Sequence, residues 1–467
     1  MNKSLLIALS GIGLVLGGCS LAPEYLKPEA PVPARWPAGA AYGKTSPDAP
    51  ATADLKWREF FADERLQKII ETALDNNRDL RLAALNVERA RAMYGIQRAE
   101  LYPAVNAQGG GGKQRQSVDL IQPGSARTLE QYSVNLGIAA WEIDFFGRIR
   151  SLSEQALQEY LATDEARRGA QIALVAEVAR VYLTLAADRE DFKLSQSTLE
   201  AQYASYGLVK KRYDVGLATE LDLKRAQIPL DTARGDVARF TQLVAQDQNA
   251  LNLLAGSTVP EEWLPVDLDS AGSPREISAS LSSEVLLHRP DIMAAEHRLK
   301  GAYASIGAAR AALFPRISLT TSIGTASNQL SGLFDSGTGT WAFMPQFVMP
   351  IFDARVWAAL RVSETDQKIV LTQYEKTIQT AFREVADALA VQGTIDEQVA
   401  AQQSLVAAAA DTYGLSMKRY TKGIDSYLGV LDAQRSHFAA QQGFVALRLA
   451  KLANQVRLYA VLGGGAE

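Results

Sequence analysis

The sequence contains two copies of one unit, and this duplication restricts the folds that the chain can adopt. Residues 206–216 and 413–423 share most of their aromatic, basic and glycine positions at a constant offset of 207. A second pair of blocks, residues 95–103 and 307–315, matches in the same order at an offset of 212. Chance does not explain two ordered matches of this length. We therefore predict a first repeat, a linker and a second repeat, at residues 54–256, 257–284 and 285–463, before a short tail, 464–467.

Each repeat contains a very long stretch that favours helix. Residues 148–215 contain no proline, and apolar side chains such as Val178, Val181 and Leu185 recur at helical spacing. Residues 355–422 repeat this pattern. At 1.5 Å per residue, a helix of this length approaches ~100 Å, which a compact globule does not accommodate. The pattern therefore predicts either a long coiled coil or a tube of packed helices.

Shorter segments with strand periodicity precede the long helices. Residues 132–138 and 317–323 alternate apolar and small polar side chains, and aromatic residues gather near the ends of such segments. This pattern fits a membrane barrel and a soluble sheet with one wet face equally well. Four strands cannot close a barrel, because unpaired backbone edges in lipid are prohibitively costly. Three copies sharing one barrel would supply twelve strands.

The N-terminus has the features of an export signal. An apolar run over residues 5–16 follows Lys3, and this run is too short to span a bilayer. We therefore predict a signal peptide at residues 1–18.

A lipid-attachment site follows the signal. Gly17 and Gly18 precede Cys19, and a lipoprotein signal peptidase requires small residues there. We predict covalent lipid on Cys19, and Ser20 in place of an aspartate favours retention in the outer membrane. Three acyl chains would exceed the marginal anchoring that one chain provides. The Pro/Ala-rich residues 19–53 are expected to form an extended strap. The alternative is an ordinary signal peptide with an incidental cysteine.

Composition argues against several other functions. A net charge of −4 gives no indication of a nucleic-acid partner. No run of 18 apolar residues follows Leu16, so we expect no transmembrane helix. None of the three histidines has metalloprotease spacing, and the glycines at 109–112 lack the other residues of a phosphate-binding loop. We therefore predict that the protein is not an enzyme and has no cofactor apart from the lipid on Cys19.

Six short motifs identify a family. They are NRDL at 77–80, EIDFFGR at 142–148, RPDI at 289–292, IGAARAALFP at 306–315, EVADAL at 384–389 and VLDAQR at 430–435. With these motifs the chain resembles the TolC-like outer-membrane efflux factors, and in particular the OprM-like lipoprotein branch that serves RND-type pumps. The resemblance covers nearly the whole chain beyond the signal peptide.

The resemblance implies a mainly α fold with a β-barrel. A homotrimer would form a twelve-stranded β-barrel in the outer membrane of a Gram-negative bacterium, a long periplasmic α-barrel and a small equatorial domain. Such a duct carries drugs or other toxic small molecules passively. A periplasmic adaptor, or membrane fusion protein, would link it to an inner-membrane RND transporter. Type I protein secretion, metal-ion efflux and a pore-free periplasmic coiled-coil interaction lipoprotein are the alternatives.

The resemblance also implies where function resides. The periplasmic tips of the helical hairpins close the duct and meet the adaptor, and here they contain Gly216, Leu217, Ala218, Thr219, Gly423, Ile424 and Ser426. We expect Asp425 to be the main gate residue, because its three copies in a trimer would form a ring of negative charge. The alternative is that Asp425 caps the returning helix. Other predicted gate residues are Tyr427 and Leu428, with tip salt bridges among Arg212, Asp214, Arg419 and Asp432.

Two departures from regularity are notable. Pro229 falls within the first returning helix, where its repeat partner is Ser436, so a kink is expected in the first copy alone. Arg355 stands where many relatives have glycine, which alters the turn from strand to helix.

Overall fold

The computed structural model describes residues 20–42, 55–122, 124–277 and 282–465. The predicted signal peptide and Cys19 lie outside these residues. The described chain divides into two compact units, and each unit draws segments from both sequence repeats. Among the described residues, the first unit draws on 20–29, 86–164 and 294–374, and the second draws on 30–85, 165–293 and 375–465. The repeats are therefore not spatial domains.

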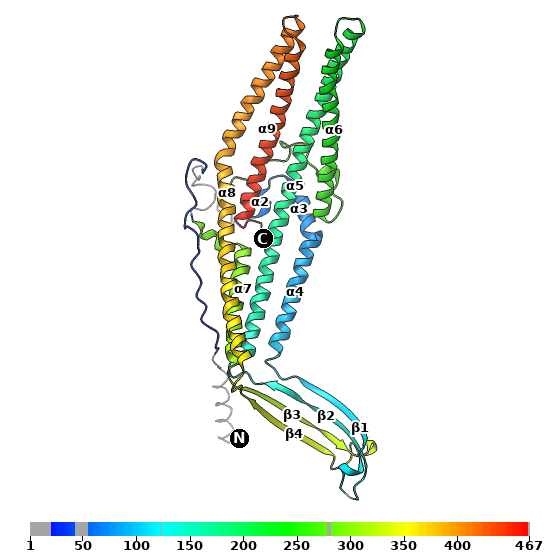
Figure 1. The fold of residues 1–467 in the computed structure, drawn as a ribbon, viewed down its shortest axis with the longest axis vertical. Coiled ribbons are helices and arrows are strands. Elements are labelled where there is room, and N and C mark those ends of the chain that lie inside the picture. Colours follow the sequence, from blue (N-terminus) through cyan, green and yellow to red (C-terminus); the bar gives the residue numbers. More distant parts are fainter. Residues whose placement is uncertain (1–19, 43–54, 123, 278–281, 466–467) are drawn as a thin grey trace. The chain divides into compact units, whose positions relative to one another are not determined.

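The first unit contains one antiparallel sheet of four strands. The strands are β1 (Val105–Arg115), β2 (Thr128–Glu142), β3 (Arg316–Ser327) and β4 (Gly339–Val348), in that spatial order (Figure 1). Two short 3-10 turns, η2 (Val118–Leu120) and η5 (Leu330–Gly332), lie in the connections within each strand pair. Each repeat therefore contributes one hairpin, and β2 pairs with β3 across the repeats, with Leu136 opposite Ile323.

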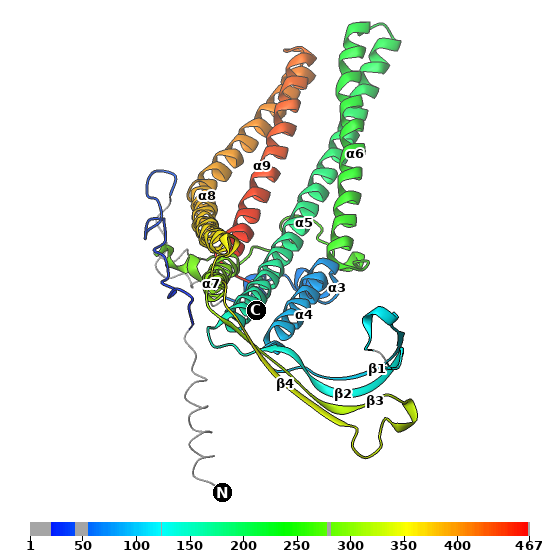
Figure 2. The same cartoon turned by 60° about the horizontal axis from the view of Figure 1, so that its bottom comes forward.

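The sheet bends, and a bulge interrupts its central pairing. The register between β2 and β3 shifts between Ile138 and Trp141. At this point Ala140 adopts a φ of 50° and its N–H donates to Thr320 Oγ1 at 3.0 Å. Bulges of this kind increase local twist and bend a strand. Figure 2 shows the four strands curving together along their length.

Large apolar side chains on the sheet are exposed. Trp341 is 80% exposed, and Ile323, Phe343 and Phe347 are each more than half exposed. In water such an apolar surface would be an aggregation liability. Within the described chain, β1 and β4 each pair on one side only, so both edges of the sheet remain open.

The helices follow the duplication closely. The first repeat contains α4 (Arg78–Ala99), α5 (Arg148–Asp214) and α6 (Glu220–Ala255). The second repeat contains α7 (Pro290–Ala311), α8 (Ala354–Thr421) and α9 (Tyr427–Val461). The two long helices, α5 and α8, contain 67 and 68 residues, which confirms the prediction made from their proline-free stretches. The helix α6 continues through Pro229, and the expected kink there stays a prediction.

An aromatic core lies in the second unit, where the short helix α2 (Trp57–Phe60), which precedes α3 (Glu64–Asn76), meets the end of α9. Phe60 stacks on Tyr459 with ring centroids 4.0 Å apart, and both side chains are at most 1% exposed. The Tyr459 hydroxyl donates to the Leu55 carbonyl at 2.7 Å, so its polar atom is satisfied within the core.

The linker between the repeats packs against the same unit. It contains η3 (Glu261–Trp263), and η4 (Ser283–His288) precedes α7. Arg289 donates to the Val461 carbonyl at 2.7 Å and pairs with Glu384 at 3.0 Å, which connects the start of α7 with α8 and the end of α9.

One helix of the described chain, α5, contains a stretch long and apolar enough to cross a membrane. However, 61% of that stretch is buried inside the fold. Burial of this extent is typical of a core helix, so the stretch is weak support for a membrane span.

Candidate functional site: the tips of the helical hairpins

The long helix of each repeat ends in the same turn. In the first repeat, Gly216 has a φ of 76°, and the N–H groups of Gly216 and Leu217 donate to the carbonyls of Tyr213 and Arg212 at 2.9 and 2.7 Å. These two bonds form a Schellman motif, which requires a left-handed residue and therefore favours glycine. Gly423 has a φ of 73° and repeats the motif in the second copy.

The two returning helices begin differently. In the first copy, the side chain of Thr219 accepts from the backbone N–H of Asp222 at 3.2 Å, and Asp222 accepts from that of Thr219 at 3.0 Å. This capping box satisfies two backbone donors. In the second copy, the Ser426 side chain makes no capping bond. A side-chain cap therefore holds the start of α6 but not the start of α9.

An ion pair takes the place of a cap in the second copy. The carboxylate of Asp425 accepts from Arg419 Nε at 2.5 Å and from Nη2 at 3.1 Å. Hydrogen bonding from Arg419 lowers the pKa of Asp425, so the pair is intact at neutral pH. The alternative in which Asp425 caps α9 is not observed. Both side chains are about half exposed, so solvent screening makes this ion pair weak.

One contact joins the two hairpins near their tips. Arg212 at the end of α5 donates to the hydroxyl of Tyr420 on α8 at 2.9 Å. The ring of Tyr420 in turn lies 5.0 Å from that of Tyr427. Arg212 therefore contacts a phenol rather than one of the carboxylates with which we had expected it to pair.

The structure does not gather the other predicted gate residues into one network. Asp432 pairs with Arg435 at 2.6 Å on α9 itself, one turn away along the same helix. No ion pair of Asp214 is found among the described residues. Leu428 is 45% exposed. Ala218 is half-buried, and Ile424 and the other tip residues are exposed.

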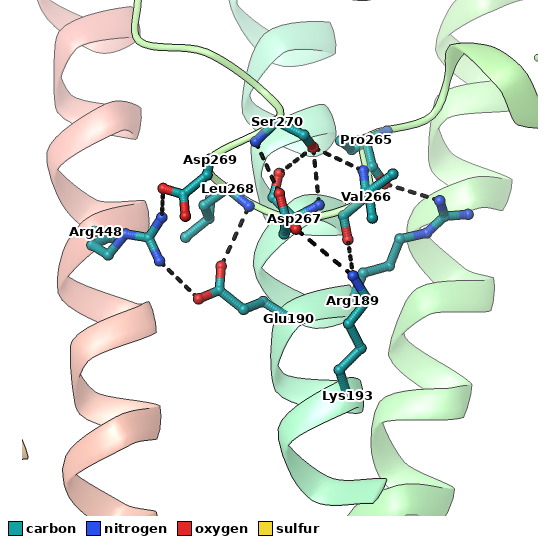
Figure 3. A network of polar contacts seen from close by, with 10 residues as sticks. All are labelled: Arg189, Glu190, Lys193, Pro265, Val266, Asp267, Leu268, Asp269, Ser270 and Arg448. Carbon is teal, nitrogen blue, oxygen red and sulfur yellow. Dashed lines mark hydrogen bonds and ion pairs between the residues drawn. The ribbon is translucent and has the colours of Figure 1, made fainter. Parts of the chain in front are cut away.

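A second polar cluster, which we did not predict from the sequence, fastens the linker to two helices (Figure 3). Arg448 of α9 donates to Glu190 of α5 at 2.7 Å and also pairs with Asp269 of the linker. Glu190 accepts from the backbone N–H of Leu268 at 3.4 Å. One guanidinium thus connects both repeats and the segment between them.

The same linker segment is held on its other side by α5. Arg189 donates to the carbonyl of Pro265 at 2.9 Å, and Lys193 lies 3.7 Å from the carboxylate of Asp267 (Figure 3). These partners are about 70 to 260 residues apart in sequence. Such long-range pairs leave no periodic signal, which explains why sequence reasoning missed them.

Three aspartates on α5 and α6 form a partly buried acidic group. Asp188 shares a hydrogen bond with Asp247, and Asp191 lies one turn further along α5. Desolvation, with a smaller contribution from Asp188, raises the pKa of Asp191 to about 7, and the same two causes raise the pKa of Asp247 to about 7. Asp191 and Asp247 therefore titrate close to neutral pH.

The comparisons with known proteins agree with this architecture. The sequence matches the outer membrane efflux protein family over residues 69–257 and 281–464. It is 49% identical over 467 residues to the toluene efflux pump outer membrane protein TtgC of Pseudomonas putida. The aligned region covers all of this chain and 96% of TtgC. It is 42% identical over 459 residues to the outer membrane protein OprJ of Pseudomonas aeruginosa, which covers 97% of this chain and 94% of that one.

Solved structures show the same fold. The open state of the MtrE outer membrane channel of Neisseria gonorrhoeae superimposes with a TM-score of 0.86 and 38% identity, over 96% of this chain and 99% of that one.

The chain is therefore an outer-membrane efflux duct of the TolC-like fold. It belongs to the outer membrane efflux protein family, whose members are passive channels and not enzymes. Its homologues are outer-membrane components of tripartite pumps, which implies a periplasmic adaptor and an inner-membrane transporter.

Proposed function

We propose that three copies of this chain close one twelve-stranded barrel and form the exit duct of an RND-type pump for toxic organic molecules. The open edges of β1 and β4 carry this proposal. A four-stranded sheet with exposed apolar side chains cannot lie in lipid with unpaired edges, because each unpaired backbone group costs several kcal/mol there. Pairing β1 of one copy with β4 of the next removes every edge.

The cargo is proposed from the relatives. TtgC is named for toluene efflux, and the tip of this chain offers a charged and aromatic gate rather than metal ligands. We therefore favour organic molecules over metal ions or secreted proteins as cargo.

We also propose that lipid on Cys19 anchors the duct. The strap that follows lies on α7, where the ring of Tyr25 meets that of Tyr303 edge to face at 5.5 Å. Lys27 pairs with Glu296 at 3.2 Å, and the carbonyl of Leu21 accepts from Arg310. These contacts support a fixed course for residues 21–27, directly after the proposed attachment point, as an anchor requires.

The gate is proposed to lie at the α8–α9 tip. Three copies would bring three Asp425 carboxylates together, and a ring of carboxylates favours cations. The Arg419–Asp425 pair and the contact from Arg212 to Tyr420 would then hold the closed form. Because the α9 start has no side-chain cap, this tip can reorganise at lower cost than its counterpart.

Planar-bilayer recordings of the purified, detergent-solubilised protein test the duct. We expect discrete channels together with a trimer that resists detergent on a gel and dissociates on heating. A folded protein that migrates as a monomer and gives no conductance would favour the pore-free periplasmic lipoprotein instead.

A further inference from the structure

The first described residues of the strap run antiparallel to α7 in a regular register. Each step back along the strap, towards the N-terminus, moves towards the C-terminal end of α7. Four contacts define this register: Lys27 with Glu296, Tyr25 with Tyr303, Ala22 with Gly307, and Leu21 with Arg310. The strap is therefore directed at the place where α7 ends and β3 begins.

A half-enclosed cavity of about 350 Å³ lies at that place. Arg310, the last residue of α7 that the strap contacts, directly precedes Ala311 and Ala312, which line the cavity. The rest of the lining comes from the end of β2, the start of α5, the start of β3 and the end of β4, and it includes Glu142, Phe145, Arg148, Phe314, Arg316 and Val348. The cavity is thus formed where the helices of the first unit meet the base of its sheet.

The proposed attachment point cannot lie far from this cavity. The carbonyl of Leu21 accepts a hydrogen bond from Arg310. Cys19 is two residues before Leu21 in the sequence, and two residues span at most about 7 Å even when fully extended. Whatever Cys19 carries therefore starts close to the end of α7, and this short tether indicates what occupies the cavity.

The walls combine apolar rings with available hydrogen-bond donors. Phe145 and Phe314 are 40% and 41% exposed, and Phe314 stacks on Phe146 with ring centroids 4.9 Å apart. Arg316 uses its Nε to pair with Glu142, and its other N–H groups make no hydrogen bond to the described residues. Guanidinium groups donate and never accept, so they suit carbonyl oxygens, whereas the rings suit methylene groups.

The size of the cavity and the surface beside it also fit a lipid. A cavity of about 150 Å³ accommodates benzene in another protein, so the volume here leaves room for a glyceryl group and the first part of its chains. Pro350 lines the cavity, and the next residues, Ile351 and Phe352, are 87% and 94% exposed. The remainder of an acyl chain could follow this apolar surface.

We propose that this cavity seats the lipid of Cys19, with Arg316 donating to an ester or amide carbonyl of its head and the first methylene groups packing on Phe145 and Phe314. The inference rests on the lipidation proposed above and goes further, because it makes the lipid a ligand of the fold as well as a membrane anchor. The seated lipid joins the strap, α7 and the base of the sheet.

Photo-crosslinking in outer membranes tests this seat. The full-length protein would carry p-benzoylphenylalanine in place of Phe314, and peptides would be analysed by mass spectrometry after illumination. We expect the probe to join the lipid on the N-terminal peptide that begins at Cys19. Tyr102 is the matched control, since it takes the place of Phe314 in the first repeat, is 65% exposed and lies at the end of α4, whereas the strap is seated on α7. A probe there should not join the Cys19 lipid.

The mass of the N-terminal peptide separates this inference from the lipidation on which it rests. A peptide without lipid would overturn both. A lipidated peptide, together with adducts of free phospholipid alone at position 314, would overturn the seat and leave the anchor intact. Equal joining of the Cys19 lipid from positions 314 and 102 would also overturn the seat.

Filling the cavity provides an independent measurement. Ala312 is half-buried in the lining, so Ala312→Trp should occupy the cavity and displace the lipid. In detergent-solubilised trimers, we expect a lipase to cleave the ester-linked chains of Cys19 about 10-fold faster in this variant, the change that burial of roughly two methylene groups would make. Glu100→Trp, at the matching position of the first repeat, should leave the rate unchanged. Equal rates in the two variants would overturn the proposal.

Discussion

At the scale of single residues, the acidic group on α5 and α6 makes stability depend on pH. Desolvation raises the pKa of Asp247 and of Asp191 to about 7 in the folded protein, well above the value of an unfolded chain. The folded state therefore binds more protons than the unfolded state between roughly pH 4 and 7. Stability contributed by this group is fully present below that window and is lost as pH rises through it.

Asp247→Asn should flatten this dependence. The amide preserves the shape and remains neutral at every pH, so the variant should gain melting temperature at pH 8 and change little at pH 5. Thermal melts at the two pH values measure the effect. Asp231→Asn, an exposed change on the same helix, serves as the control, and an equal gain for both variants would contradict the assignment.

The Arg419–Asp425 pair permits a charge-swap experiment at the proposed gate. Asp425→Ala should raise the open probability and reduce cation preference in single-channel recordings. The double variant Arg419→Asp, Asp425→Arg keeps the pair but reverses the sign of the ring. We expect it to restore closure and to lose cation preference. Asp432→Ala, a change outside the pair, serves as the control. If Asp425→Ala behaves like this control and like the unmodified channel, Asp425 contributes neither to closure nor to cation preference.

At the scale of elements, the two hairpin tips differ by one cap. Thr219→Ala removes the capping box and should destabilise the start of α6 by about 1 kcal/mol. Hydrogen exchange of the amides just after position 219 should accelerate about fivefold. Ser426→Ala is the matched change in the other copy and should have no effect, because Ser426 makes no capping bond. Similar acceleration in both copies would refute the difference.

The seat of the strap on α7 depends on a glycine. A Cβ at Gly307 would lie 2.8 Å from both the backbone N and the Cβ of Ala22, and 2.7 Å from Ser151 Oγ. Gly307→Ala should therefore displace the strap and expose it to limited proteolysis. At Gly301 the nearest atom to an added Cβ is 3.5 Å away, so Gly301→Ala should remain resistant. Equal resistance of the two variants would show that the strap is not seated there.

The elements themselves were predictable because their signals are local. A proline-free stretch and an apolar period defined α5 and α8 to within a residue, and the glycines 216 and 423 marked their ends. The partners of the charged residues were not predictable. Arg212 bonds to Tyr420, and Arg419 pairs with Asp425. The turn geometry, rather than charge alone, decides which of these groups meet.

At the scale of the whole molecule, the duplication gives each chain two similar hairpins of helices and two of strands. Sequence identified the repeats, but the compact units mix segments from both, since strands and helix ends pair across the copies. The polar cluster around Arg448 fixes the linker between the two repeats. What the single chain leaves incomplete is its sheet, which retains two open edges.

Disulfide trapping across those edges tests the central claim most directly. Cys19 is the only native cysteine, so engineered thiols in β1 and β4 react without interference from any other side chain when that residue is lipidated. A cysteine at Gln108 of β1 would be combined in turn with one at Thr340, Ala342 or Met344 of β4. The account predicts that at least one pair yields covalent dimers and trimers, and nothing larger, after oxidation in outer membranes. Monomers alone from every pair, or a ladder beyond three, would contradict a barrel closed by three chains.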